Sequence, residues 1–283
     1  MITKSMYPCQ NIPTVIFGNR CLKQCLYCEL YKYHFSEEKI ILNSGGSGSF
    51  LKPLVDILSK YKGAYFSPVT DCFLQENSRL THYYLEETWK LNPNWVPLIV
   101  TKQVIPSKTI NLIIKNKHRL VLQISVPSTN AKIVSIMEPG CASIEERLKM
   151  IKGLTDNEVP VIVVIMPWFD LDKPENLAEK LFKAGISRTI IANGILTKKT
   201  KQKMLNSENA KLKQIAESVC YIEEATSNGL VLPKEKRVES LARLIKALNN
   251  LGIKTKVCIS DNHDLGNTDL PLCGGFKHHN FKK

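Results

Sequence analysis

Three cysteines near the amino end carry the clearest chemical signal. Cys21, Cys25 and Cys28 follow the pattern C-x3-C-x2-C, directly after an apolar segment that predicts a strand. Three thiolates from one loop can bind three irons of a [4Fe-4S] cubane and leave the fourth iron open to an outside ligand. A closed structural zinc site would need a fourth protein ligand, for which His34 is the nearest candidate. The spacing therefore favours an open iron–sulfur cluster over zinc.

An open iron of this kind can be chelated by the amino and carboxylate groups of S-adenosylmethionine. An electron from the reduced cluster then cleaves the sulfonium and gives a 5′-deoxyadenosyl radical. Tyr27, directly before the last cysteine, fits this interpretation, as does the place of the loop after the first predicted strand. The loop is therefore a candidate site for radical chemistry.

Short apolar runs and the helical patterns between them predict the scaffold that positions this loop. Runs rich in β-branched residues predict buried strands at about residues 14–17, 64–66, 97–100, 120–124, 161–165, 189–191 and 255–259. Amphipathic spacing predicts helices near 51–58, 144–151 and 238–248, the second with a capping box made by Ser143 and Glu146. This alternation indicates an α/β fold, either a doubly wound sheet or a full or partial barrel.

Composition narrows the class of protein. The 283 residues include 39 Lys and Arg against 26 Asp and Glu, a net charge of +13, which suits either an anionic partner such as nucleic acid or a lysine-rich solvated surface. No apolar run approaches the ~18 residues of a membrane helix, and the first residues lack the apolar stretch of a signal peptide. We expect a cytoplasmic protein whose nine cysteines are thiols or metal ligands.

Several short motifs have little specificity individually, but their order along the chain is more specific. They occupy residues 67–76, 79–81, 99–102, 123–125, 138–139 and 145–148. With the cysteine loop, this order resembles the radical S-adenosylmethionine superfamily, in the branch related to spore photoproduct lyase, over about residues 14 to 192. The resemblance implies a partial (β/α)6 barrel in a single domain over residues 1–283. Its core would span about 12–192, and a polar C-terminal extension would span about 193–283.

The resemblance also implies roles for individual side chains. Cys21, Cys25 and Cys28 would hold the cluster, and a reducing partner such as flavodoxin or ferredoxin would supply electrons. Most of the other implied sites follow predicted strands, where barrel enzymes place their chemistry. These cofactor-binding residues are Tyr27 beside adenine, Thr70 at the methionine amino group, Lys102 at its carboxylate, Ser125 as a hydrogen-bonding group, and Glu138 near the ribose. For Thr70 and Ser125 the alternative is a hydroxyl that caps a turn.

The chain departs from the branch at one point that matters for catalysis. Relatives usually carry Pro and Tyr after the Thr-Asp pair, where this chain has Cys72 and Phe73. Authentic spore photoproduct lyases place a hydrogen-donating cysteine just before the matching threonine, where this chain has Pro68 and Val69. Cys72 is therefore either a hydrogen donor on the other side of Thr70 or a small buried core residue.

Asp, Asn, His and Cys residues gather after the last predicted strand and suggest a polar lid. Cys258, Cys273 and His263 are candidates for a second cluster or a zinc site. Asp261, Asp264 and Asp269 are candidates to bind a guanine-like edge, because a carboxylate accepts two donors there. An ordinary solvated tail is the third interpretation. Cys9, Cys141 and Cys220 stand apart from these motifs and are interpreted as incidental thiols.

These features together favour a radical lyase that acts on a modified nucleobase or nucleoside, such as a deazapurine cleaved by a queuine lyase-like enzyme. Three alternatives stay open. The first is a repair lyase acting on nucleic acid, with its basic surface on the phosphates and the reacting base everted into the barrel. The second is a radical peptide maturase. The third is not an enzyme but a zinc-stabilised basic adaptor that binds nucleic acid.

Overall fold

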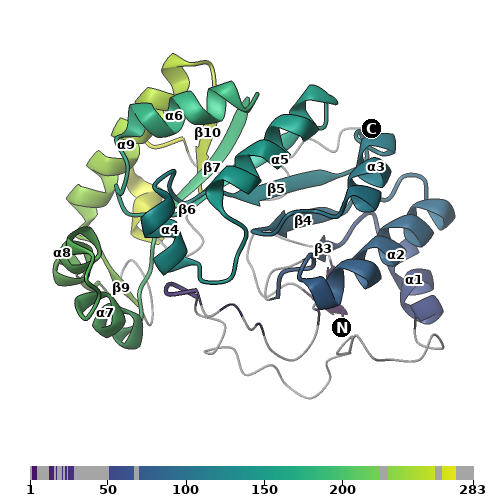
Figure 1. The fold of residues 1–283 in the computed structure, drawn as a ribbon, viewed down its shortest axis with the longest axis horizontal. Coiled ribbons are helices and arrows are strands. Elements are labelled where there is room, and N and C mark those ends of the chain that lie inside the picture. Colours follow the sequence, from purple (N-terminus) through teal and green to yellow (C-terminus); the bar gives the residue numbers. More distant parts are fainter. Residues whose placement is uncertain are drawn as a thin grey trace.

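One mostly parallel sheet organises the structure, which is a computed structural model (Figure 1). Its strand order is β1-β2-β3-β4-β5-β6-β7-β10. The strands are β1 (Ile2–Lys4), β2 (Pro13–Val15), β3 (Tyr65–Phe66), β4 (Leu98–Thr101), β5 (Val121–Ser125), β6 (Val161–Trp168), β7 (Arg188–Asn193) and β10 (Lys254–Val257). Only β1 and β2 pair antiparallel in this sheet, and every later neighbour pair is parallel. The predicted strands are thus found close to their expected positions.

The structure describes residues 2–4, 13–15, 17, 21, 23, 25–28, 51–66, 70–222, 229–258 and 263–271. Two of the predicted site residues, Asp261 and Cys273, lie outside the described residues, as do His34 and Cys9. Cys21, Cys25 and Cys28, the three cysteines of the C-x3-C-x2-C pattern, all lie within the described residues.

The strand order decides between the two α/β architectures that the sequence pattern left open. A doubly wound sheet reverses its strand order and carries helices on both faces. Here β2 to β7 follow one another in the sheet as they do in the chain, and β10 is added beyond β7. Right-handed crossovers that always step the same way place their helices on one face, as in a barrel. The end strands β1 and β10 do not pair with each other, so the described part of the barrel is open. The predicted partial barrel is confirmed.

Helices cover the outer face of this curved sheet (Figure 1). They are α1 (Leu51–Ser59), α2 (Gln75–Leu91), α3 (Ser107–Lys115), α5 (Ile144–Asp156), α6 (Pro174–Lys183) and α9 (Lys234–Asn250). Their apolar faces meet alternate strand residues such as Ile124, Val163 and Ile165 in the main core cluster. The predicted capping box at the start of α5 is present, with Ser143 and Glu146 each accepting from the other's backbone N–H. Burial of these faces fixes the strand register.

The inner face of the sheet is defined by a second, smaller set of buried side chains. Leu98, Val121 and Ile162 form a separate cluster against which Tyr65 and Ile190 pack. Side chains alternate across a strand, so residues an even number of positions away share this face. Lys102 follows Leu98 by four positions and Ser125 follows Val121 by four. The register therefore directs both predicted cofactor ligands to the inside of the barrel at its carboxyl edge.

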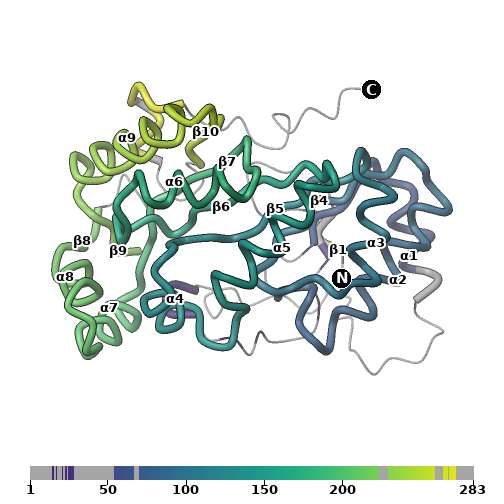
Figure 2. Tube along the Cα trace, turned by 45° about the horizontal axis from the view of Figure 1, so that its top comes forward, coloured from purple at the N-terminus to yellow at the C-terminus, as the bar shows by residue number. Residues whose placement is uncertain are grey.

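A separate group of elements lies at one end of the sheet (Figure 2). It comprises α4 (Ala131–Met137), α7 (Lys198–Leu205), α8 (Ala210–Ser218), β8 (Cys220–Tyr221) and β9 (Leu230–Val231). Their apolar side chains form a second core cluster, and Leu26 and Tyr27 of the cysteine loop pack against it. This cluster therefore supports the predicted metal-binding loop from outside the sheet. No helix within the described ranges is long and apolar enough to cross a membrane.

Candidate functional site

The cysteine loop is held at the carboxyl edge of the barrel by backbone hydrogen bonds. The Leu26 N–H donates to the Met137 carbonyl oxygen at the end of α4 (2.8 Å), and the Cys28 N–H donates to the Cys25 carbonyl oxygen (3.0 Å), which closes a turn. Cys21, Cys25 and Cys28 are all half-buried. Burial raises the pKa of the Cys21 thiol, and the neighbouring Cys25 raises it further. Cys21 and Cys25 thus lie close enough to interact electrostatically.

Tyr27 is held by a buried ionic network that includes Glu138 and Arg147. Its hydroxyl donates to one carboxylate oxygen of Glu138. The other oxygen lies 2.6 Å from Arg147 Nη1, and both side chains of this ion pair are fully buried. Arg147 also donates to the carbonyl oxygens of Ser125 (2.9 Å) and Ala142 (3.0 Å). The two oxygens of Glu138 thus contact Tyr27 and Arg147, and its predicted place near the cofactor ribose stays a prediction.

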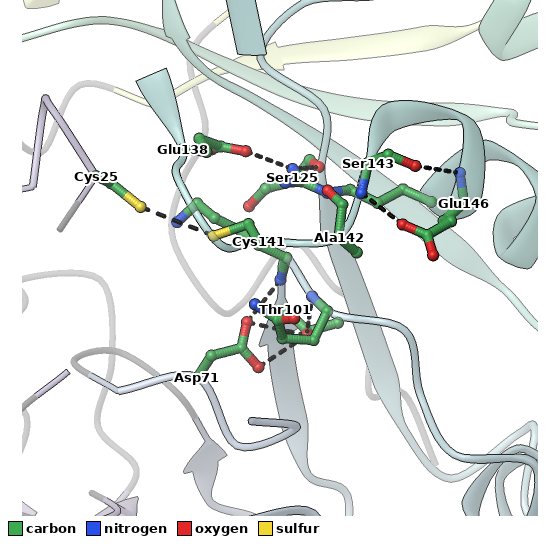
Figure 3. A network of polar contacts seen from close by, with 12 residues as sticks. Cys25, Asp71, Thr101, Ser125, Glu138, Cys141, Ala142, Ser143 and Glu146 are labelled. Carbon is green, nitrogen blue, oxygen red and sulfur yellow. Dashed lines mark hydrogen bonds and ion pairs between the residues drawn. The ribbon is translucent and has the colours of Figure 1, made fainter. Parts of the chain in front are cut away.

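Asp71 is a positioning residue that the sequence analysis did not single out. Its carboxylate accepts hydrogen bonds from the Phe73 N–H (2.9 Å), the Thr101 hydroxyl (2.9 Å) and the Lys102 N–H (2.7 Å). Burial raises the pKa of Asp71, and these hydrogen bonds oppose that shift. The bonds tie the loop after β3 to the end of β4, as the contact between Asp71 and Thr101 shows (Figure 3). Thr70 and Lys102, which adjoin these two residues in the chain, therefore belong to one edge of the site.

Thr70 and Lys102 provide a hydroxyl and an ammonium group at this edge. Thr70 is 2% exposed, and its hydroxyl has no hydrogen-bond partner among the described residues. A buried hydroxyl without a partner is costly, which favours a role in binding a ligand. Lys102 Nζ lies 5.6 Å from the centre of the Tyr27 ring. Burial opposes its charge, but nearby Glu138 and Cys25 raise the pKa of Lys102 overall. Lys102 is therefore cationic at neutral pH.

Cys141, which the sequence analysis interprets as a buried or incidental thiol, lies beside the cysteine loop. Its Sγ lies 3.9 Å from Cys25 Sγ (Figure 3). The chain separation of 116 positions hid this contact. One signal was available, because Cys141 follows the predicted site residue Glu138 by three positions.

Other predicted residues lie in places that favour structural roles. Cys72 is fully buried within the main core cluster, as expected for a small apolar residue, and its hydrogen-donor role stays a prediction. Asp264 pairs with the buried Arg237 through both carboxylate oxygens, one at 3.0 Å and the other at 2.5 Å. Asp269 is exposed and Cys258 is half-buried. Substrate binding by the aspartates and a second metal site at Cys258 stay predictions.

The donor set of the loop fits an iron–sulfur cluster. Cys21, Cys25 and Cys28 are three half-buried thiols on one short loop, and the cation of Lys102 interacts electrostatically with Cys25. Within the described ranges, no three His, Cys, Asp or Glu side chains are close enough to share a single metal ion. In a cubane each thiolate binds its own iron, so an iron–sulfur cluster does not require three side chains that share one metal ion.

Comparison with known proteins identifies the fold. No family model matches the chain. Uncharacterized protein ORF301 from Acidianus two-tailed virus is 24% identical over 170 residues, which span 56% of this chain and 56% of that protein, little more than half its length. Spore photoproduct lyase complexed with dinucleoside spore photoproduct superposes with a TM-score of 0.61 at 15% identity, covering 91% of this chain and 78% of that chain.

A second solved structure extends the comparison. Streptococcus suis SuiB bound to S-adenosylmethionine superposes with a TM-score of 0.51 at 12% identity, covering 87% of this chain and 51% of that chain. One neighbour is a spore photoproduct lyase, and the other, SuiB, is bound to S-adenosylmethionine. The chain shares the fold of these proteins, and the predicted likeness to spore photoproduct lyase holds at the level of structure.

Proposed function

We propose that this protein is a radical S-adenosylmethionine enzyme, acting as a lyase on a modified nucleobase or nucleoside. One observation carries the proposal. The three-cysteine loop sits at the carboxyl edge of an open parallel barrel, where Tyr27 and the cation of Lys102 lie 5.6 Å apart. Barrel enzymes place their reactive groups at this edge. The loop, the ring and the cation are the parts that the proposed chemistry needs.

Different residues of the site would bind the cluster and the cofactor. Cys21, Cys25 and Cys28 would hold a [4Fe-4S] cluster, which when bound supplies the electron for reductive cleavage of S-adenosylmethionine. Lys102 would pair with the methionine carboxylate, and the unpartnered hydroxyl of Thr70 would accept from its amino group. Tyr27, held by Glu138 and Arg147, would form one wall beside adenine and exclude water.

An exposed apolar side chain near the carboxyl end of β6 would suit a flat aromatic substrate. Met166 lies within the register irregularity between Ile165 and Trp168, and its side chain is 38% exposed. A thioether makes favourable contacts with aromatic rings, so Met166 suits a nucleobase. The neighbouring spore photoproduct lyase structure holds a dinucleoside photoproduct, which supports the same substrate class.

Anaerobic reconstitution with iron and sulfide tests the enzyme proposal. The wild-type protein should bind about four irons per chain and, with dithionite, convert S-adenosylmethionine to 5′-deoxyadenosine. Cys28→Ala should lose both, because two thiolates do not hold the cluster. Cys220→Ala is the matched control, since this exposed cysteine of β8 lies outside the loop. A wild-type protein that binds stoichiometric zinc and no iron, or a Cys28→Ala variant with unchanged cleavage, would overturn the proposal.

Exposed lysines on β10 favour a second candidate, a repair lyase acting on nucleic acid. Lys256 pairs in register with Ile190, which packs on the inner face, and Lys254 lies two positions earlier on that face. Both lysines are exposed, and in a nucleic-acid complex they would contact phosphates. Oligonucleotide binding at several salt concentrations separates the candidates. For a nucleic-acid substrate, Lys256→Ala should lower the salt slope by about one; salt-independent binding would exclude the phosphate contacts.

A further inference from the structure

A fourth thiol lies beside the metal-binding loop but outside its cysteine pattern. We propose that Cys25 and Cys141 form a redox-active dithiol that closes to a disulfide when the loop holds no cluster. Their Sγ atoms lie 3.9 Å apart and share a hydrogen bond. Cys141 comes from the segment between α4 and α5, so the pair joins two parts of the chain that the fold alone brings together (Figure 3).

The two segments are locked together around this pair. Three further contacts join them, each between a residue of the cysteine loop and a residue near the end of α4. They are the hydrogen bond from the Leu26 N–H to the Met137 carbonyl oxygen, the bond from Tyr27 to Glu138, and the packing of the Lys23 side chain against Gly140. These contacts hold the thiols near each other and give them a high effective concentration.

The geometry needs only a short movement for the bond to form. A disulfide has its sulfurs about 2.05 Å apart, so the two Sγ atoms must approach by about 1.9 Å. Both residues lie in irregular segments rather than in a helix or strand, which allows backbone adjustment of that size. Cys25 and Cys141 are both half-buried, so a small oxidant reaches them.

The reaction balances with a low-molecular-weight disulfide as the oxidant. Cys141 sulfur attacks one sulfur of oxidised glutathione, and glutathione leaves as the thiolate. Cys25 sulfur then attacks the Cys141 sulfur of this mixed disulfide and displaces the second glutathione. The protein loses two electrons and two protons, which reduce the oxidant to two glutathione thiols.

The disulfide would control metal loading. This consequence rests on the proposed function, because it requires Cys25 to be a cluster ligand. An oxidised loop would present only two thiolates and exclude the cluster until a reductant reopens it. The thiol pair would thereby protect a cluster ligand from irreversible oxidation while the site is empty.

Peptide mapping of the cluster-free protein tests the proposal directly. The full-length protein is reduced, freed of reductant, incubated with oxidised glutathione, alkylated and digested without reduction. We expect the Cys25–Cys141 cross-link at least about tenfold above any other cross-link of Cys25, because the folded structure raises its effective concentration. Cys25 recovered mainly with Cys21 or Cys28, as a thiol, or as a lasting mixed disulfide with glutathione would overturn the proposal.

Two variants and a second measurement complete the test. Cys141→Ser should abolish the cross-link, whereas Cys220→Ser, which removes an exposed thiol on β8, should leave it unchanged. Iron uptake by the oxidised wild type should fall at least about tenfold and return after dithiothreitol. A reduced wild type that takes up no iron would overturn the proposed function but not the disulfide. A cross-linked protein that loads iron normally would overturn the control of metal loading.

Discussion

Arg147 connects α5 to the carboxyl edge of the sheet. Replacing it tests how much its ion pair with Glu138 contributes to the stability of the fold. Arg147→Met keeps much of the side-chain length but leaves the Glu138 carboxylate buried without a countercharge. Removing one partner of a buried ion pair costs about 3–5 kcal/mol. The carbonyl oxygens of Ser125 and Ala142 also lose their donor, at about 1 kcal/mol each. We expect the free energy of unfolding to fall by about 5 kcal/mol.

Urea unfolding of the reduced, cluster-free protein measures this loss. With a slope of about 3 kcal/mol per molar urea, the midpoint should fall by about 1.7 M. In the double variant Glu138→Gln with Arg147→Met, the neutral amide still accepts from Tyr27 and no charge stays buried, so stability should be partly restored. Lys152→Met is the matched control in α5, because its ion pair with Asp156 is exposed. A loss below about 1 kcal/mol for Arg147→Met, or a double variant no more stable than the single, would refute the reasoning.

Three further predictions concern Lys102 at the carboxyl edge of the sheet, Glu146 at the start of α5, and Asp264 after β10. Lys102→Ala should retain iron but weaken S-adenosylmethionine binding at least about tenfold in equilibrium dialysis, whereas the exposed Lys108→Ala should not; equal affinities would exclude the carboxylate contact. The N-cap serine of α5 lowers the pKa of Glu146 through its backbone N–H and hydroxyl, so the ionised side chain stabilises the fold above its unfolded pKa of 4.5. That contribution is lost as pH falls through the lower folded pKa, so thermal unfolding of wild type and Glu146→Gln should converge in acid; a constant gap would contradict it. Asp264→Asn should lower the free energy of unfolding in urea by about 3 kcal/mol, because Arg237 stays buried and charged. Asp269→Asn, at an exposed site, is the control. An equal loss in the two variants would refute the stabilising role of the Asp264–Arg237 pair.

Local sequence patterns predicted the strands well because both faces of a parallel sheet are covered. The run at residues 161–165, for example, is apolar throughout and became the centre of β6. The same patterns carried no information on strand order, which depends on how successive crossovers step across the sheet. The strand order is known only from the structure, and it indicates a partial barrel rather than a doubly wound sheet.

The candidate site was predictable where residues belong to one short motif and obscure where distant segments meet. Cys21, Cys25 and Cys28 are visible in the sequence because a single loop supplies them. Cys141 has no periodicity or spacing that links it to Cys25, since their contact depends on the docking of α4. Asp264 was predicted to face substrate because it lies in a polar stretch, whereas its carboxylate pairs with Arg237 of α9, a partner that local sequence does not reveal.

The packing of Leu26 and Tyr27 on the second core cluster bears on how this protein can be truncated. A fragment ending near residue 192 would keep β2 to β7 but lose α7 and α8, whose apolar side chains back the loop. The cysteine loop of such a fragment would lack the apolar surface on which Leu26 and Tyr27 pack. A shortened version of the protein that keeps the loop in place must therefore include α7 and α8, which are distant from the cysteines in sequence.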